Sequence, residues 1–121
     1  MFDPDKLEVY QRAFVFAGEI KKVTLGFPKF EMYELGSQMR RASDSIGANI
    51  REGCGNRTSK DYISFLYNAL GSAKEMGHHI NSAFRDGYID EVLRDKFLGE
   101  IVEISKMIYG VVGYVKKKDL K

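Results

Sequence analysis

Apolar residues recur every three or four positions along four stretches of the chain, and this spacing predicts four amphipathic helices. The predicted helices cover residues 4–25, 32–52, 59–85 and 90–117. Residues that favour turns separate them, namely Gly26 to Pro28, Gly53 to Asn56, and Asp86 with Gly87. Residues that cap helices stand before three of the four: Asp3 with Pro4, then Thr58 or Ser59, then Asp90.

Helices of similar length joined by short connections are typical of an antiparallel up-down-up-down four-helix bundle. Each predicted helix has roughly 20 to 28 residues, and its length is therefore roughly 30 to 40 Å. No stretch alternates apolar and polar residues for long enough to predict a sheet. With 121 residues, of which 44% are apolar, the chain can bury one core, so we expect a single all-α domain over residues 1–121.

Two of the predicted helices carry apolar residues beside the stripe that faces the core. These residues are Tyr10, Phe14 and Ala17 in the first helix and Leu98, Val102 and Val112 in the fourth. Either the two helices are unusually buried within the chain, or they also contact another subunit. The pattern favours oligomerisation.

Polar residues follow the border of the apolar stripe in the second and third helices. A structural polar network between the two helices would include Gln38, Arg41, Ser45, Asn49, Glu52, Ser72 and Glu75. In that network, Arg41 and Asn49 would satisfy carboxylates such as Glu75. The alternative is an ordinary hydrated flank, and the sequence does not decide between the two.

The net charge of +2, from 19 basic and 17 acidic residues, does not by itself predict a nucleic-acid or membrane-surface partner. Its distribution is uneven. Residues 34–60 carry five basic and three acidic side chains and residues 106–121 carry five and one, whereas residues 61–105 carry four and eight. This separation either forms a phosphate-binding surface, which an oligomer would multiply, or reflects lysines and arginines that only keep the surface hydrated.

Metal-binding and catalytic patterns are incomplete in this sequence. Glu75 and His78 match a Glu-x-x-His element of di-iron bundles, but His79 is the only other histidine, so a second element cannot form. Cys54 lies at the end of a predicted helix, where the helix dipole disfavours a thiolate, and no base is identifiable nearby. We therefore expect no metal, no cofactor and no catalytic residues.

The sequence also indicates in which cellular compartment the protein is expected. No apolar run approaches the ~20 residues that a membrane-spanning helix needs, and the first residues do not form a signal peptide. The single cysteine, Cys54, excludes an intrachain disulfide. The expected location is the cytoplasm, without membrane attachment.

Short motifs in the second and third predicted helices form a distinctive series. The second helix and the following loop contain Gln38 to Ser43, Ser45-Ile46, Asn49-Ile50, Glu52-Gly53 and Asn56-Arg57. The third helix adds Phe65-Leu66, Ala69, Gly71-Ser72 and Glu75. Together they resemble the signature of the four-helix-bundle family of 23S ribosomal RNA intervening-sequence proteins. One departure is Arg51, where the family usually has alanine.

The resemblance implies a bundle that assembles as a ring-like homopentamer. Proteins of this family are encoded within intervening sequences of 23S rRNA genes or elsewhere in bacterial genomes, and are sometimes labelled as ribosomal proteins. The accessory variability protein of diversity-generating retroelements looks like a relative, and it implies a basic surface that binds nucleic acid and a reverse transcriptase as protein partner.

The leading hypothesis is therefore a non-enzymatic oligomer that binds RNA or DNA without strong sequence preference. Phosphate contacts would come from Arg40, Arg51, Arg57, Lys60, Lys116, Lys117 and Lys118. The alternative hypothesis is a protein-interaction or assembly scaffold that binds no nucleic acid.

Overall fold

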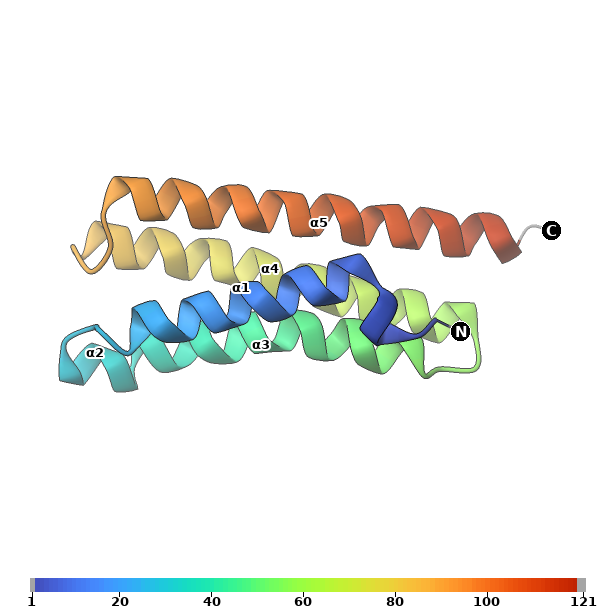
Figure 1. Cartoon of the computed structure of the whole chain (residues 1–121), viewed down its shortest axis with the longest axis horizontal. Coiled ribbons are helices and arrows are strands. Elements are labelled where there is room, and N and C mark those ends of the chain that lie inside the picture. The colour runs from blue at the N-terminus through green and yellow to red at the C-terminus, as the bar shows by residue number, and fades with distance from the viewer. Residues whose placement is uncertain (1, 120–121) are drawn as a thin grey trace.

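The computed structural model describes residues 2–119, and its long helices run alternately up and down along one axis (Figure 1). Its elements are η1 (Pro4–Lys6), α1 (Glu8–Thr24), α2 (Lys29–Tyr33), α3 (Leu35–Cys54), α4 (Ser59–Arg85) and α5 (Glu91–Asp119). The described part of the chain contains no strand. The all-α prediction and the four long helices are thus confirmed.

The N-terminal boundary differs from the predicted one. Asp3 acts as a cap, but its Oδ1 accepts from the backbone N–H of Asp5 at 3.0 Å and closes only the 3-10 turn η1. The backbone of Leu7 is then extended, with φ −84° and ψ 115°, and this interrupts the helical path before α1 begins at Glu8. The side chain of Gln11 donates to the carbonyl of Asp5 at 2.6 Å and holds η1 against the first turn of α1.

The connection between α1 and α3 contains the short helix α2, which the sequence pattern does not predict as a separate element. Pro28 is the N-cap residue of α2, with φ −50° and ψ 143°. The backbone of Glu34, with φ −99° and ψ −90°, then separates α2 from α3. The predicted helix over residues 32–52 therefore corresponds to α3, shifted toward the C-terminus.

The starts of α4 and α5 follow the expected cap chemistry. Thr58 Oγ1 accepts from the backbone N–H of Asp61 at 3.1 Å. Asp90 Oδ1 accepts from the backbone N–H of Leu93 at 2.8 Å. Each cap satisfies one of the N–H groups that a helix start leaves without an intrahelical partner.

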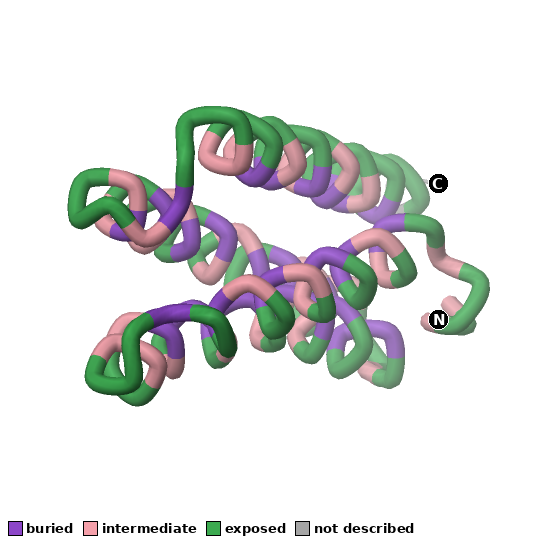
Figure 2. The backbone as a smooth tube through the Cα atoms, turned by 60° about the vertical axis from the view of Figure 1, so that its left-hand side comes forward, coloured by how far each residue is buried: buried purple, intermediate pink, exposed green. Residues whose placement is uncertain are grey.

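The core lies along the inner sides of the four long helices, where the buried residues face one another (Figure 2). The closest packing joins α3 to α4, and α3 also packs against α1 while α5 packs against α4. Among the four neighbouring pairs of long helices, the first and last helices, α1 and α5, pack least closely. They meet at the edge-to-face rings of Phe16 and Phe97, at the ion pair of Arg12 with Glu100, and at the ion pair of Lys96 with Glu19.

Candidate functional site

Most of the basic residues singled out from the sequence lie at one end of the bundle. The loop between α3 and α4 is at the same end as the last turns of α5 (Figure 1). This end therefore brings together residues that are far apart in the sequence. We call them the basic end, and they are Arg51, Arg57, Lys60, Lys116, Lys117 and Lys118.

The members of the basic end differ in whether they form an ion pair with an acidic side chain. All six are exposed. Arg51 Nη1 lies 2.9 Å from Asp5 Oδ1, which raises the pKa of Arg51, and its guanidinium lies 5.4 Å from the ring centroid of Tyr10. By contrast, Arg57, Lys60, Lys117 and Lys118 make no ion pair within residues 2–119. Arg51 thus connects α3 to η1, and its positive charge is already paired with a carboxylate.

Arg40 does not join the basic end. It is half-buried near the start of α3, where its Nη1 donates to Thr24 Oγ1 at 3.0 Å and its Nη2 donates to the carbonyl of Met32 at 3.0 Å. These bonds connect α3 to the end of α1 and to α2. These donors of Arg40 are therefore used within the chain, and Arg40 lies apart from the other residues predicted to bind phosphate.

The polar border between α3 and α4 forms a smaller network than the sequence suggests. Ser45 Oγ lies 2.8 Å from Ser72 Oγ, and Asn49 Nδ2 donates to Ser45 Oγ at 3.0 Å. The remaining members, Gln38, Arg41, Glu52 and Glu75, are exposed. Glu75 lies 3.9 Å from His79, and no ion pair joins it to Arg41 within the described residues. The network therefore consists of the three half-buried residues Ser45, Asn49 and Ser72.

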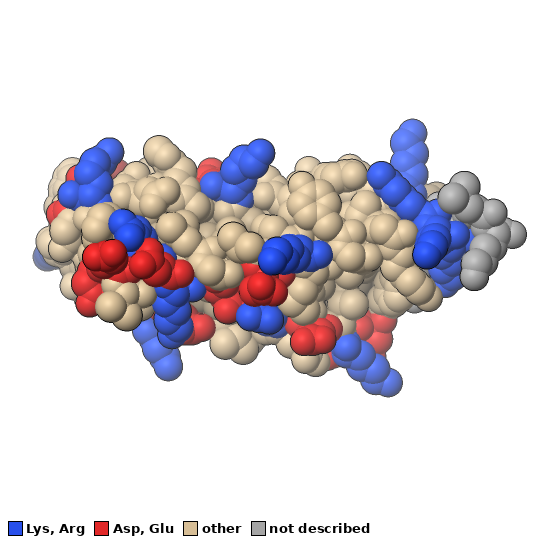
Figure 3. Space-filling model, turned by 90° about the horizontal axis from the view of Figure 1, so that it is seen from above, with Lys and Arg blue, Asp and Glu red and all other residues tan. Residues whose placement is uncertain are grey.

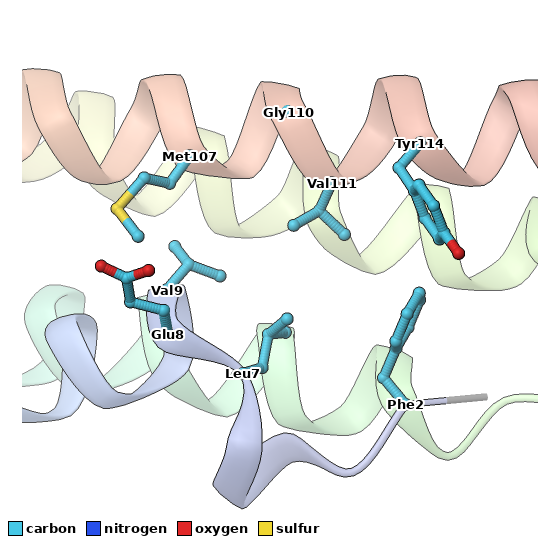
Figure 4. A pocket seen from close by; sticks show the side chains of 8 residues that line it. All are labelled: Phe2, Leu7, Glu8, Val9, Met107, Gly110, Val111 and Tyr114. Carbon is cyan, nitrogen blue, oxygen red and sulfur yellow. The ribbon is translucent and has the colours of Figure 1, made fainter.

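An apolar cavity of about 360 Å³ opens between the start of α1 and the second half of α5. Figure 4 shows Phe2 and Tyr114 toward one end of it and Met107 toward the other, with the Glu8 carboxylate beside Met107. The phenyl ring of Phe2 also lies 5.6 Å from the ring of Tyr62, centroid to centroid. The lining thus offers apolar surface and one carboxylate, and it follows from the loose packing of α1 against α5.

Cysteine and histidine occupy positions that fit structural roles. Cys54 is the last residue of α3 and 2% exposed, and its Sγ lies 3.6 Å from the hydroxyl of Tyr62. The side chain of His79 is 12% exposed, and burial lowers its pKa, while Glu75 acts in the opposite direction. No group of three His, Cys, Asp or Glu side chains within residues 2–119 is placed to hold a metal ion. None of the described helices is both long and apolar enough to cross a bilayer.

Sequence reasoning missed a set of exposed tyrosines beside lysines on α4 and α5. Tyr67 is 46% exposed, and Lys116 Nζ lies 3.4 Å from its hydroxyl oxygen. Tyr109, seven residues before Lys116, is 59% exposed. Because a spacing of seven residues returns to the same helix face, the sequence indicates that Tyr109 and Lys116 share a face of their helix. It does not indicate that this face lies beside Tyr67.

Comparison with known proteins agrees with the fold. The model of the family described as 23S rRNA-intervening sequence protein matches residues 5–110. A crystal structure of a protein of unknown function from Bacteroides thetaiotaomicron VPI-5482, a member of the S23 ribosomal protein family, is similar to this fold with a TM-score of 0.79. The two sequences are 26% identical. The match covers 87% of this chain and 95% of that one. Neither description names a catalytic activity, and no curated protein matches the chain.

Proposed function

The chain belongs to the family of 23S rRNA-intervening sequence proteins, and from this premise we propose that it is a non-enzymatic bundle that binds RNA or DNA. Binding takes place at the basic end, through contacts to phosphates and without strong sequence preference. The protein works in the cytoplasm, where both kinds of nucleic acid are accessible.

The observation that carries this proposal is the convergence of unengaged cations. Arg57 and Lys60 are far in the sequence from Lys117 and Lys118, yet all four lie at one end, exposed and without ion pairs in the described residues. Keeping like charges close together has an electrostatic cost. A bound polyanion removes that cost and releases counterions from its own phosphates.

We also propose that the protein assembles as a homopentamer, as the family resemblance implies. The support from this chain is a groove between α1 and α3, lined by Tyr10, Phe14, Ala17, Gly47 and Ala48 among others. Phe14 is 66% exposed there, so the central residue of the second apolar face of the first helix is not covered within the chain. A ring needs two different patches on each subunit, and this groove supplies one of them. Five basic ends in one ring strengthen the binding of a single long polyanion.

Sedimentation tests the assembly. The unsubstituted protein should sediment as a pentamer at micromolar concentration, and Phe14→Glu should dissociate it, because a charge in a buried subunit contact is costly. The matched control is Phe30→Glu on α2, since Phe30 is also exposed but lies outside the groove. A monomer for the unsubstituted protein contradicts the pentamer.

Salt dependence tests nucleic-acid binding. A fluorescent RNA of generic sequence should bind at low salt, and its affinity should fall roughly a hundred-fold or more between about 50 and 200 mM salt if about five phosphates are contacted. Replacing Arg57, Lys60 and Lys117 by glutamine should weaken binding and flatten this dependence. The control replaces Lys21 and Lys22 by glutamine, because these lysines are exposed on α1 away from the basic end.

The second candidate function is an assembly scaffold with a protein partner such as a reverse transcriptase. The groove on α1 and α3 is compatible with that function as well. Absence of RNA and DNA binding at low salt would favour the scaffold over the leading proposal.

A further inference from the structure

A second surface rich in lysine and tyrosine follows the junction of α4 and α5. We call it the α4–α5 seam. Its members are Lys60, Ser64, Tyr67, Gly71, Lys74 and His78 of α4, and Val102, Lys106, Tyr109, Gly113 and Lys116 of α5. Within each helix they are spaced by three or four residues, so each set occupies one face, and all of them are exposed. Neither set contains an aspartate or a glutamate.

Contacts between the helices show that the two faces adjoin. Lys116 Nζ donates to the hydroxyl of Tyr67 at 3.4 Å and lies 5.9 Å from the centroid of its ring. Because the helices run antiparallel, seven residues from Tyr67 to Lys74 and seven from Lys116 back to Tyr109 cover the same distance, about 10 Å. Each of two successive levels of the seam therefore contains one tyrosine and one lysine.

The surface between the two levels is low and unobstructed. Gly71 lies between Tyr67 and Lys74 on α4, and Gly113 lies between Tyr109 and Lys116 on α5. A Cβ added to either glycine would find no atom within 4 Å. Glycine inside a helix costs about 1 kcal/mol relative to alanine, so these two residues are not explained by helix stability. They leave room for a flat group to lie against the rings of Tyr67 and Tyr109.

The charge around the seam is also one-sided. Figure 3 looks down on α5, and most of the acidic surface in that view lies in its lower half. On α5, Glu100 pairs with Arg12 of α1. Lys106 lies 3.8 Å from Glu103, but both are exposed, and such a pair contributes little. The seam positions thus present cations and aromatic faces, and Glu103 is the carboxylate that pairs with one of their lysines in the described residues.

We propose that the α4–α5 seam binds single-stranded nucleic acid, with bases stacked on Tyr67 and Tyr109 and phosphates held by Lys60, Lys74 and Lys116. This rests on the proposed function and sharpens it, because the seam continues from the basic end through Lys60 and Lys116. Every base has a face that can stack on an aromatic ring, so the contact tolerates any sequence. A duplex hides those faces, and the tyrosines then have nothing to stack on.

Binding of an unstructured 12-nucleotide RNA and of a 12-base-pair duplex, each fluorescently labelled, tests the proposal. The single strand should bind more tightly to the unsubstituted protein. Tyr67→Leu with Tyr109→Leu should weaken single-strand binding by roughly ten-fold or more while leaving duplex binding unchanged, since stacking is lost and charge is kept. The matched control is Tyr33→Leu, because Tyr33 is 64% exposed on α2, outside the seam.

A tryptophan variant keeps an aromatic ring for stacking and reports on the stacking through its fluorescence. The chain contains no tryptophan, so Tyr109→Trp introduces a single indole at the seam. Single-stranded RNA should quench its fluorescence and the duplex should not. Tyr33→Trp should respond to neither.

The outcomes separate the two proposals. If the unsubstituted protein binds neither RNA at low salt, the proposed function fails and the seam proposal fails with it. If the protein binds RNA but binds the duplex more tightly, only the seam proposal is overturned. The same holds if the tyrosine substitutions leave the affinity for single-stranded RNA unchanged. If the double leucine variant sediments as a smaller assembly, the seam is a subunit contact and the proposal is likewise overturned.

Discussion

Gly53 of α3 lies against the buried ring of Tyr62 in α4, so close that an added Cβ would be 2.7 Å from the ring's Cδ1. The same Cβ would be 3.1 Å from the Cβ of Phe65. The last turn of α3 can therefore approach the first turn of α4 only because residue 53 has no side chain. This contact brings Cys54 and Tyr62 together and positions the loop that carries Arg57.

Gly53→Ala should lower the free energy of unfolding by about 1 to 2 kcal/mol. The clash with Tyr62 costs more than the helix propensity of alanine returns, because the ring is fully buried and cannot move aside easily. Urea unfolding followed by circular dichroism measures the change. Gly99→Ala is the matched control, since a Cβ there meets nothing within 4 Å, and it should stabilise the protein by about 0.5 to 1 kcal/mol.

Ser72→Ala should destabilise the protein by about 0.5 to 1.5 kcal/mol, because Ser45 loses its partner across α3 and α4. Asn49→Ala removes the other bond to the same hydroxyl. Since both act on Ser45, the two substitutions should not be additive in a double-mutant cycle. Additive effects would mean that the three residues do not form a network.

Arg40→Gln should lower stability by roughly 1 to 3 kcal/mol without weakening RNA binding at fixed salt. Its guanidinium satisfies Thr24 and the carbonyl of Met32, so its loss loosens the junction of α1, α2 and α3. Thermal unfolding and RNA titration of the same variant separate the two effects. Arg41→Gln, at an exposed neighbouring position, should leave stability nearly unchanged. Weaker RNA binding by a fully folded Arg40→Gln would restore Arg40 to the phosphate-binding residues.

Stability should decrease as the pH falls from 7.5 to about 5.5, with His79 contributing. Burial lowers the pKa of His79 in the folded state, so below the ordinary pKa near 6.5 the unfolded chain takes up the proton more readily. Protonation therefore favours unfolding as the pH falls. Urea unfolding at both pH values should show a smaller difference for His79→Gln. His78→Gln should keep most of the difference, because burial lowers the pKa of His79 more than the neighbouring His78 does.

The long helices and the caps at Thr58 and Asp90 were predictable because they depend on residues close together in the sequence. The break at Leu7 was not, since the residues that follow continue the helical period without a sign of the extended backbone. The contacts of Arg40 were not predictable for a related reason. Its partners Thr24 and Met32 reach it only through the turn that α2 makes.

The candidate site was partly predictable. Charge summed along the chain identified Arg57, Lys60 and the three lysines of residues 116–118, and the antiparallel order of the helices brings them to one end. The pairing of Tyr67 with Lys116 depends on which side of α4 faces α5. Helical periodicity gives the faces of each helix but not their neighbours, so a contact of this kind becomes visible only in three dimensions.

The best-packed helices, α3 and α4, are consecutive long helices in the sequence, whereas the loosest neighbouring pair, α1 and α5, consists of the first and last long helices. Bringing α3 and α4 together closes only a short loop, and the entropic cost of their docking is small. We expect this hairpin to form early in folding, with α1 then attaching to α3 and α5 to α4. Amide hydrogens of α3 and α4 should then exchange most slowly with solvent, because either outer helix can detach while the hairpin persists.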